Sequence, residues 1–214
     1  MAASIKICGL TQPDDAAIAA GAGASYLGVV FARSPRRVTA SVAESIVVAA
    51  RGIPVIGVFG GQQVFEILRV CAELGLAGAQ LHTPYPVSVA RRLRDAGLLV
   101  WRVGRLAFPE DLDGIALLRE SSSAVLVEAR VPDALGGTGV SLPLDLAREA
   151  RARLPGHQMV LAGGLTAEIV AEAIEAVHPD IVDVSSGVEL RPGVKDPDRI
   201  MKFIEAVLGH QPSR

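Results

Sequence analysis

The sequence has few aromatic residues: one Trp, two Tyr and five Phe in 214 residues. It also lacks a surplus of charge of either sign, since 21 Lys and Arg face 23 Asp and Glu and give a formal net charge of -2. A nucleic-acid-binding surface needs a positive field and, for single strands, aromatic rings on which bases stack. We therefore expect no nucleic acid among its partners.

Long hydrophobic runs are also missing. The longest stretch without a charged residue, 16–32, is interrupted by glycines, whereas a membrane-spanning helix needs about 20 mostly apolar residues. Within 1–15, Lys6 stands where a signal peptide would carry its apolar segment. We expect no membrane partner and a cytoplasmic location, a reducing compartment in which Cys8 and Cys71 stay free thiols.

The remaining composition is that of an ordinary globular domain, with 50% hydrophobic and 21% charged residues. Short runs rich in Val, Ile and Leu alternate with longer segments in which charges recur at helical spacing. This alternation is typical of parallel strands separated by amphipathic helices. We predict strands at Ile5–Cys8, Tyr26–Phe31, Pro54–Phe59, Gly78–His82, Leu98–Val103, Ala124–Glu128, Met159–Ala162 and Ile181–Ser185.

Helices are predicted between the strands. Several begin with Thr, Ser, Asp or Pro at the cap or first-turn position, and Gly75 and Gly97 stand where two of them should end. The predicted helices are Pro13–Ala22, Val42–Arg51, Gln63–Leu74, Pro86–Ala96, Glu110–Glu120, Leu144–Leu154, Ala167–Val177 and Pro197–Leu208.

Eight βα units without a linker predict a single-domain α/β fold, a (β/α)₈ barrel over residues 1–208. Residues 209–214 are predicted to form a flexible C-terminal tail. The competing architecture is a doubly wound open sheet. Its dinucleotide-binding form would carry a Gly-x-Gly-x-x-Gly turn after the first strand, which this sequence lacks, although a flavodoxin-like sheet needs none.

The active site of such a barrel lies at the C-terminal face of the strands. Residues near the predicted strand ends are therefore the first candidates for function. They are Cys8, Arg36, His82, Glu128, Gly163, Gly164, Ser185, Ser186 and Gly187.

The first strand should point Lys6 and Cys8 into the barrel, because its apolar residues, Ile5 and Ile7, occupy the alternate positions. A buried ammonium group needs a counter-charge. The last strand is the neighbour of the first in a closed barrel and carries Asp183, so we predict a Lys6–Asp183 ion pair. This pair is either purely structural or supports catalysis, and the sequence alone leaves both readings open.

Cys8 has two readings. A free cysteine is usually a buried, inert residue, whereas one at the mouth of a barrel near a lysine and several arginines has surroundings that lower the pKa of the thiol. The second reading predicts a base or nucleophile. Cys71 shares a helical face with apolar residues, and we predict that it belongs to the core.

Two glycine-containing loops, Gly163–Gly164 and 185–187, follow the last two predicted strands. These loops often bind phosphate in this fold, because backbone N–H groups converge there. A third loop, Gly136-Gly137-Thr138-Gly139, suits either a mobile lid or an ordinary surface loop.

Six motifs carry a resemblance to a known family, and they are followed by Pro192-Gly193 and Lys195-Asp196. On these motifs the chain resembles the phosphoribosylanthranilate isomerases from end to end. The motifs are Lys6-Ile7-Cys8-Gly9-Leu10-Thr11, Ser34-Pro35-Arg36, Gln80-Leu81-His82, Gly136-Gly137-Thr138-Gly139, Ala162-Gly163-Gly164-Leu165 and Val182-Asp183-Val184-Ser185-Ser186-Gly187-Val188-Glu189.

The resemblance implies a cofactor-free and metal-free isomerase of tryptophan biosynthesis, a monomer or homodimer. Its phosphosugar substrate, N-(5-phosphoribosyl)anthranilate, would undergo an Amadori rearrangement. By the same resemblance, Cys8 is the general base at ribose C2, Arg36 holds the anthranilate carboxylate, and the loops after the last two strands hold the phosphate. His82 is expected to contact the substrate, and the residue at position 128 is the general acid that opens the ring.

One departure affects the acid, because Glu128 stands where the family has an aspartate. Asp133 in the next loop is a weaker candidate for this role. A non-catalytic phosphosugar-binding barrel is therefore an alternative. A related isomerase of the histidine pathway would favour paired aspartates on the first and sixth strands, and Cys8 argues against it.

Overall fold

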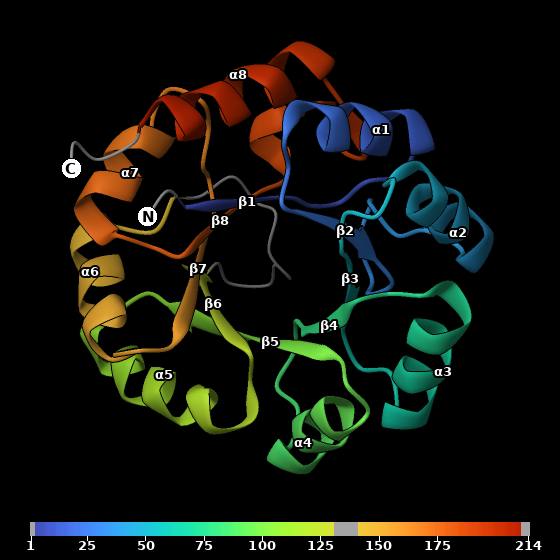
Figure 1. The fold of residues 1–214 in the computed structure, drawn as a ribbon. Coiled ribbons are helices and arrows are strands. Elements are labelled where there is room, and N and C mark those ends of the chain that lie inside the picture. The colour runs from blue at the N-terminus through green and yellow to red at the C-terminus, as the bar shows by residue number, and fades with distance from the viewer. Residues whose placement is uncertain (1–2, 131–140, 211–214) are drawn as a thin grey trace.

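A computed structural model describes residues 3–130 and 141–210 of the chain. Its parallel strands β1 to β8 form a closed barrel, with the helices arranged around the outside (Figure 1). The strands are β1 Ser4–Ile7, β2 Tyr26–Val30, β3 Val55–Phe59, β4 Gly78–Leu81, β5 Leu99–Leu106, β6 Ala124–Ala129, β7 Gln158–Ala162 and β8 Ile181–Val184.

The helices follow the strands in the predicted order. The fifth is shorter than predicted because its flanking residues, Pro109–Asp111 and Arg119–Ser121, form 3₁₀ turns. The helices are α1 Pro13–Ala22, α2 Ala40–Ala49, α3 Val64–Leu74, α4 Val87–Asp95, α5 Leu112–Leu118, α6 Leu144–Ala152, α7 Val170–Val177 and α8 Pro197–Gly209.

Closure of the sheet decides between the two predicted architectures. Strand β1 pairs in parallel with both β2 and β8, and Lys6 lies opposite Asp183 in the β1–β8 register. An open doubly wound sheet would leave two unpaired edges. The (β/α)₈ barrel is therefore confirmed, and the open-sheet alternative is wrong.

The apolar core has two layers. The larger one lies between the strands and the helices and includes Ile5 and Ile7. The smaller one fills the barrel and includes Ile56, Trp101 and Leu126. Because alternate residues of a strand face opposite sides, this division confirms that Lys6 and Cys8 share the inward side of β1.

Glycine ends two helices as predicted. Gly75 caps α3 with φ 64°, and Gly97 follows α4 with φ 83°, a left-handed conformation that favours glycine. Helix α8 includes Gly209 and so runs one residue into the segment predicted as a tail. Residues 211–214 lie outside the described part of the chain.

One feature was absent from the prediction. After β8, a 3₁₀ turn at Ser186–Val188 leads into an antiparallel hairpin made of β9 Glu189–Arg191 and β10 Val194–Lys195. The hairpin lies between β8 and α8, and Gly193 in its turn has φ 84°. It brings two charged residues, Glu189 and Lys195, into the buried interior.

Within 3–130 and 141–210, no helix combines the length and the apolarity that crossing a bilayer requires.

Candidate active site

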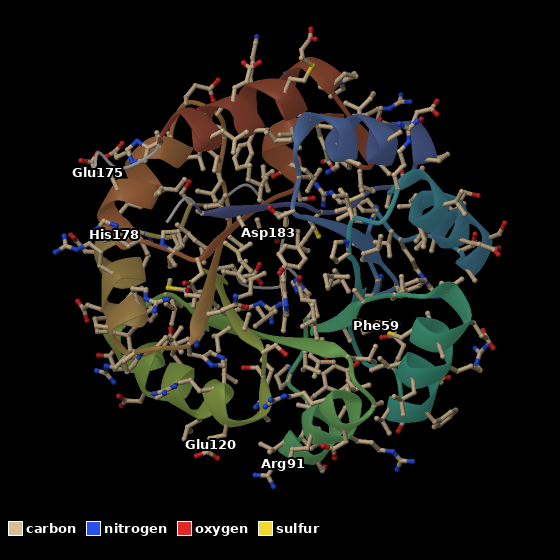
Figure 2. All side chains as sticks on the ribbon, in the orientation of Figure 1. Phe59, Arg91, Glu120, Glu175, His178 and Asp183 are labelled. Carbon is tan, nitrogen blue, oxygen red and sulfur yellow. The ribbon has the colours of Figure 1, made fainter. Side chains whose placement is uncertain are left out.

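A pocket of about 510 Å³ opens at the C-terminal ends of the strands. Asp183, which lines it, lies near the barrel axis (Figure 2). The pocket collects side chains from strand ends that are far apart in the sequence. Its lining residues are Cys8, Val30, Ala32, Arg33, Ser34, Arg36, Val58, Gln80, His82, Glu128, Asp183 and Ser185.

A second pocket of about 370 Å³ adjoins the first and shares Glu128, Asp183 and Ser185 with it. Its other walls are the two loops predicted to bind phosphate, and all five residues named there line it: Gly163, Gly164, Ser185, Ser186 and Gly187.

The backbone of these loops approaches the second pocket closely because they contain glycine. Gly163 and Gly164 have φ values of 93° and 66°, which side chains rarely tolerate. A Cβ on Gly187 would lie 2.0 Å from the carbonyl oxygen of Leu165, so that position cannot hold another residue without moving the loop. These glycines bring main chain to the wall of this pocket, a surface able to offer N–H groups to an anion.

The predicted Lys6–Asp183 ion pair is present. The Lys6 Nζ lies 2.9 Å from Asp183 Oδ1 and 3.0 Å from Gln80 Oε1, and the Lys6 side chain is fully buried. It also lies 5.5 Å from the centre of the Trp101 ring, a cation–π distance. These contacts supply the counter-charge and acceptors that a buried ammonium group requires.

Gly28 on β2 makes room for both Lys6 and Cys8. A Cβ at Gly28 would lie 2.8 Å from Cys8 Sγ and 3.1 Å from Lys6 Cε. The two side chains therefore lie against the same spot on β2, and Lys6 interacts with the Cys8 thiol.

The prediction that these surroundings lower the pKa of Cys8 is wrong. Burial raises the pKa of the thiol, and the negative charge of Asp183 adds to this effect. Lys6 and Lys195 act in the opposite direction, but they do not outweigh burial. Cys8 is therefore a protonated thiol in the free protein at neutral pH, with cations beside it that favour the thiolate.

Glu128 lies at the end of β6 and is buried, and it lines both pockets. The neighbouring strand holds it in place: Arg105 Nε donates to Glu128 Oε1 at 2.9 Å. Arg105 Nη2 donates to the carbonyl oxygen of His82 at 2.7 Å. Arg105 thus ties the ends of β4, β5 and β6 together.

Arg105 was not among the predicted site residues. The predicted fifth strand ended at Val103, whereas β5 continues to Leu106 and carries Arg105 into register with Glu128. A longer strand would have revealed this neighbour.

Arg36, in the loop after β2, lines the first pocket and is bound side-on by Glu189. Its Nε and Nη2 donate to the two carboxylate oxygens at 2.8 and 2.7 Å. A guanidinium group has five N–H donors, so three remain for another acceptor. Glu189 and its second partner, Lys195, were also missed, because nothing in their spacing predicts the hairpin that carries them.

His82 is buried and lines the first pocket, as the sequence predicted. The predicted lid, Gly136-Gly137-Thr138-Gly139, and Asp133 lie outside the described residues. Among the residues that the structure describes, no group of three or more His, Cys, Asp and Glu side chains is arranged to hold a metal. The expected lack of metal and cofactor remains a prediction.

Cys71 belongs to the core, as predicted. It lies on α3 beside Ile67, packs in the layer between sheet and helices, and forms no disulfide. Burial raises the pKa of its thiol to about 12.

Comparisons with known proteins place this geometry in one family. The family model described as N-(5'phosphoribosyl)anthranilate (PRA) isomerase matches residues 5–206. The chain is 44% identical to the N-(5'-phosphoribosyl)anthranilate isomerase of Roseiflexus castenholzii over 212 residues, with 94% of this chain and 96% of the relative covered. It is 41% identical to the protein of the same name from Trichlorobacter lovleyi over 202 residues, with 94% and 95% covered.

Solved structures agree. The phosphoribosyl anthranilate isomerase of Thermotoga maritima superposes with a TM-score of 0.88 at 32% identity, with 97% of this chain and 99% of that chain covered. A phosphoribosyl anthranilate isomerase in complex with reduced 1-(o-carboxyphenylamino)-1-deoxyribulose 5-phosphate superposes with a TM-score of 0.85 at 32% identity, with 97% and 99% covered.

Proposed function

Since the chain belongs to the N-(5'-phosphoribosyl)anthranilate isomerase family, we propose that the pocket at the strand ends is its active site, with Cys8 as general base and Glu128 as general acid. The protein is an isomerase of tryptophan biosynthesis, which converts N-(5-phosphoribosyl)anthranilate to 1-(2-carboxyphenylamino)-1-deoxyribulose 5-phosphate. The observation that carries the site assignment is the presence of Cys8, Arg36 and Glu128 on the walls of one pocket.

The rearrangement needs two proton transfers. A proton must reach the ring oxygen so that the furanose opens, and another must leave C2 so that the ketose forms. Glu128 in its protonated form supplies the first, and Cys8 as the thiolate accepts the second. Separate residues suit the two steps because the donor must start protonated and the acceptor must start free of its proton.

The substrate carries an anion at each end. We assign the carboxylate end to Arg36, which keeps three free donors, and the phosphate end to the second pocket, with its backbone walls of Gly163, Gly164 and Ser185 to Gly187. Two fixed anions orient the sugar between base and acid. The solved relative bound to the reduced product analogue, which also carries a carboxylate and a phosphate, supports this assignment.

Lys6 and Asp183 are assigned supporting roles. Cys8 must lose its proton to act as a base, and burial opposes this loss. Lys6 is the nearest cation that opposes the effect of burial, and Asp183 holds Lys6 in position. His82, which directly follows β4, contributes to the wall of the first pocket.

One observation favours the alternative, a phosphosugar-binding barrel with impaired chemistry. Glu128 forms an ion pair with Arg105. An ion pair forms with the carboxylate, whereas ring opening needs the protonated acid. We therefore assign the ring-opening step to the protonated form of Glu128, and the test below decides between the two functions.

The test follows the fluorescence of the anthranilate group in the substrate as purified protein consumes it. Turnover that is lost when Cys8 is replaced by Ala supports the assignment. No turnover, together with retained binding of the reduced product analogue, would instead support the binding barrel.

We also propose that the protein acts in the cytoplasm, where Cys8 and Cys71 stay reduced, and that it is either a monomer or a homodimer. Both states occur among its solved relatives, since monomers have been generated from the dimeric phosphoribosylanthranilate isomerase of Thermotoga maritima. Light scattering of the purified chain distinguishes the two states.

A further inference from the structure

The hairpin after β8 places two charged side chains behind the pocket. Glu189 is 5% exposed and Lys195 is 2% exposed, and neither lines either pocket described above. Burying charges is unfavourable unless they are paired and hydrogen-bonded. A gain in stability therefore does not explain why Glu189 and Lys195 are buried here.

Glu189 determines which edge of Arg36 remains available. Its carboxylate occupies Nε and one N–H of Nη2, so the free donors are the two N–H groups of Nη1 and the second of Nη2. These three donors suit end-on, two-point binding of a second carboxylate. Glu189 thus turns a flexible arginine into a fixed receptor with a defined orientation.

Both members of this pair are charged. The hydrogen bond to Glu189 raises the pKa of Arg36. Burial acts to raise the pKa of the Glu189 carboxyl, but the hydrogen bond from Arg36 and the charge of Lys195 hold it below its usual range.

Lys195 adds a positive charge to the Arg36–Glu189 pair. An Arg36–Glu189 pair is neutral as a whole and attracts an anion only weakly. Lys195 Nζ lies 2.9 Å from Glu189 Oε1, and the three groups together carry a net positive charge. The cluster of Arg36, Glu189 and Lys195 therefore favours an anionic substrate, and the Asp15 carboxylate beside Lys195 offsets part of this positive charge.

Lys195 also reaches the other end of the site. Its Nζ donates to the carbonyl oxygen of Ser185 at 3.0 Å, in the loop that lines the second pocket. On the far side of the hairpin, the hydroxyl of Thr11 donates to the carbonyl oxygen of Gly193, which ties the hairpin to the loop after β1. The hairpin thus connects the loops that follow β1, β2 and β8.

We propose that Glu189 and Lys195 are positioning residues: they orient Arg36 so that the site selects substrates bearing a carboxylate, and they couple that end to the phosphate end. The inference rests on the proposed function, because it assumes that Arg36 binds the anthranilate carboxylate. Neither residue touches the substrate. Each acts through another group, Glu189 through Arg36 and Lys195 through Glu189 and Ser185.

The test compares two ligands, the reduced product analogue and the same compound without its carboxyl group. The ratio of their dissociation constants measures the carboxylate preference of the site. Glu189→Gln should reduce this preference by about 10- to 100-fold, because a displaced guanidinium no longer meets the carboxylate squarely. In the same variant KM should rise, because the carboxylate is held less tightly, whereas kcat should change little. The affinity for inorganic phosphate should stay as in the unchanged protein.

Lys195 gives a second, independent readout. Lys195→Met should weaken both the carboxylate preference and the binding of inorganic phosphate, because Lys195 contacts Glu189 and Ser185 alike. Lys195→Arg should restore part of both, since it keeps the charge. As a control, Glu73→Gln removes an exposed ion pair on α3 and should change neither quantity.

Folding is checked by circular dichroism, and if Glu189→Gln does not fold, Glu189→Asp replaces it. The aspartate keeps the charge but is one methylene too short for the side-on pair, so it should reduce the carboxylate preference to a smaller extent.

Arg36→Met separates the two possible failures. If this variant keeps the carboxylate preference, the role of Arg36 in the proposed function is wrong. If Arg36→Met loses the preference while folded Glu189→Gln or Glu189→Asp keeps it, the positioning role is wrong and the proposed function stands. If Glu189→Gln lowers kcat and KM is unchanged, the positioning role is equally overturned.

Discussion

The mouth of the barrel and the layer between the strands and α3 each bury one free thiol, but the two thiols have different neighbours. Around Cys71 the neighbours are apolar, and burial alone raises the pKa of the thiol to about 12. Around Cys8 burial also raises the pKa, but Lys6 and Lys195 oppose it. Both thiols are buried, but charged side chains act only on Cys8.

The difference shows what a closed barrel does with its interior. Below the mouth, Trp101, Leu126 and their neighbours fill the barrel with apolar side chains. At the mouth, the same inward-facing positions carry Lys6, Asp183 and Glu128, and most of their charges are paired. We therefore expect substitutions at the mouth to affect activity most and substitutions in the outer layer to affect stability most.

The largest effect should follow from Cys8→Ala. Loss of a general base typically lowers turnover by about 10²- to 10⁴-fold, while the small change in volume leaves the fold and the binding of the reduced product analogue intact. The measurement is the decay of substrate fluorescence, with Cys71→Ala as the matched control. Activity within tenfold of the unchanged protein would remove Cys8 as the base.

Glu128→Gln should come next. It keeps the shape of the side chain but removes the proposed proton donor, and we expect kcat to fall by about 10²-fold or more. Glu128→Asp should be slower than the unchanged protein because the shorter side chain withdraws from Arg105. A faster Glu128→Asp variant would instead identify Glu128 as a poorly placed acid.

Substitutions in the Lys6–Asp183 pair test whether the buried charges at the barrel mouth depend on each other. Lys6→Met leaves Asp183 buried without its partner and should cost about 3–5 kcal/mol of unfolding free energy in urea. The double variant Lys6→Met, Asp183→Asn removes both charges and should recover most of this loss. A double variant no more stable than the single one would contradict this account.

Alkylation by iodoacetamide reads the thiol of Cys8 directly. Only the thiolate reacts, and burial raises the pKa of Cys8, so the reaction should be slow at neutral pH and should accelerate as the pH rises beyond the range in which an ordinary thiol titrates. In the Lys6→Met, Asp183→Asn variant the loss of Lys6 outweighs the loss of Asp183, and the curve should move to higher pH. An unchanged curve would show that the ion pair does not influence Cys8.

Arg105→Met should have a smaller effect. It leaves Glu128 in place but removes the contact that orients it, so kcat should fall about tenfold with little change in KM. Combined with Glu128→Gln, it should add nothing, because both act on the same proton transfer. An additive loss would assign Arg105 a role of its own.

The smallest effect on activity should come from Cys71→Ala. It removes a buried sulfur atom from the layer beside α3 and should lower the unfolding free energy by about 1 kcal/mol. Turnover and its pH dependence should stay as in the unchanged protein. A clear loss of turnover would contradict the expectation that the outer layer affects stability and not activity.

Much of the site could be read from the chain, because the strand ends of a closed barrel meet at one face. Cys8, Arg36, His82 and Glu128 were placed there by strand position, and all four line the first pocket. The parity of β1 and the closure of the barrel also predicted the Lys6–Asp183 pair. Of the residues that were missed, Arg105 lies beyond the predicted end of the fifth strand, whereas Glu189 and Lys195 act through side-chain contacts that no periodicity encodes.

The alternation of apolar runs with amphipathic segments by itself predicted eight βα units and which side chains of a strand share a face, since these follow from the local periods of strand and helix. The tertiary structure added the closure of the sheet into a barrel. Only the tertiary structure decided the state of those side chains. The pKa of Cys8 depends on the balance between burial and the charges of Lys6, Lys195 and Asp183. The orientation of Arg36 depends on Glu189, which lies 153 positions further along the chain. Desolvation and pairing act through space, so their outcome depends on distances that form only once the barrel has closed.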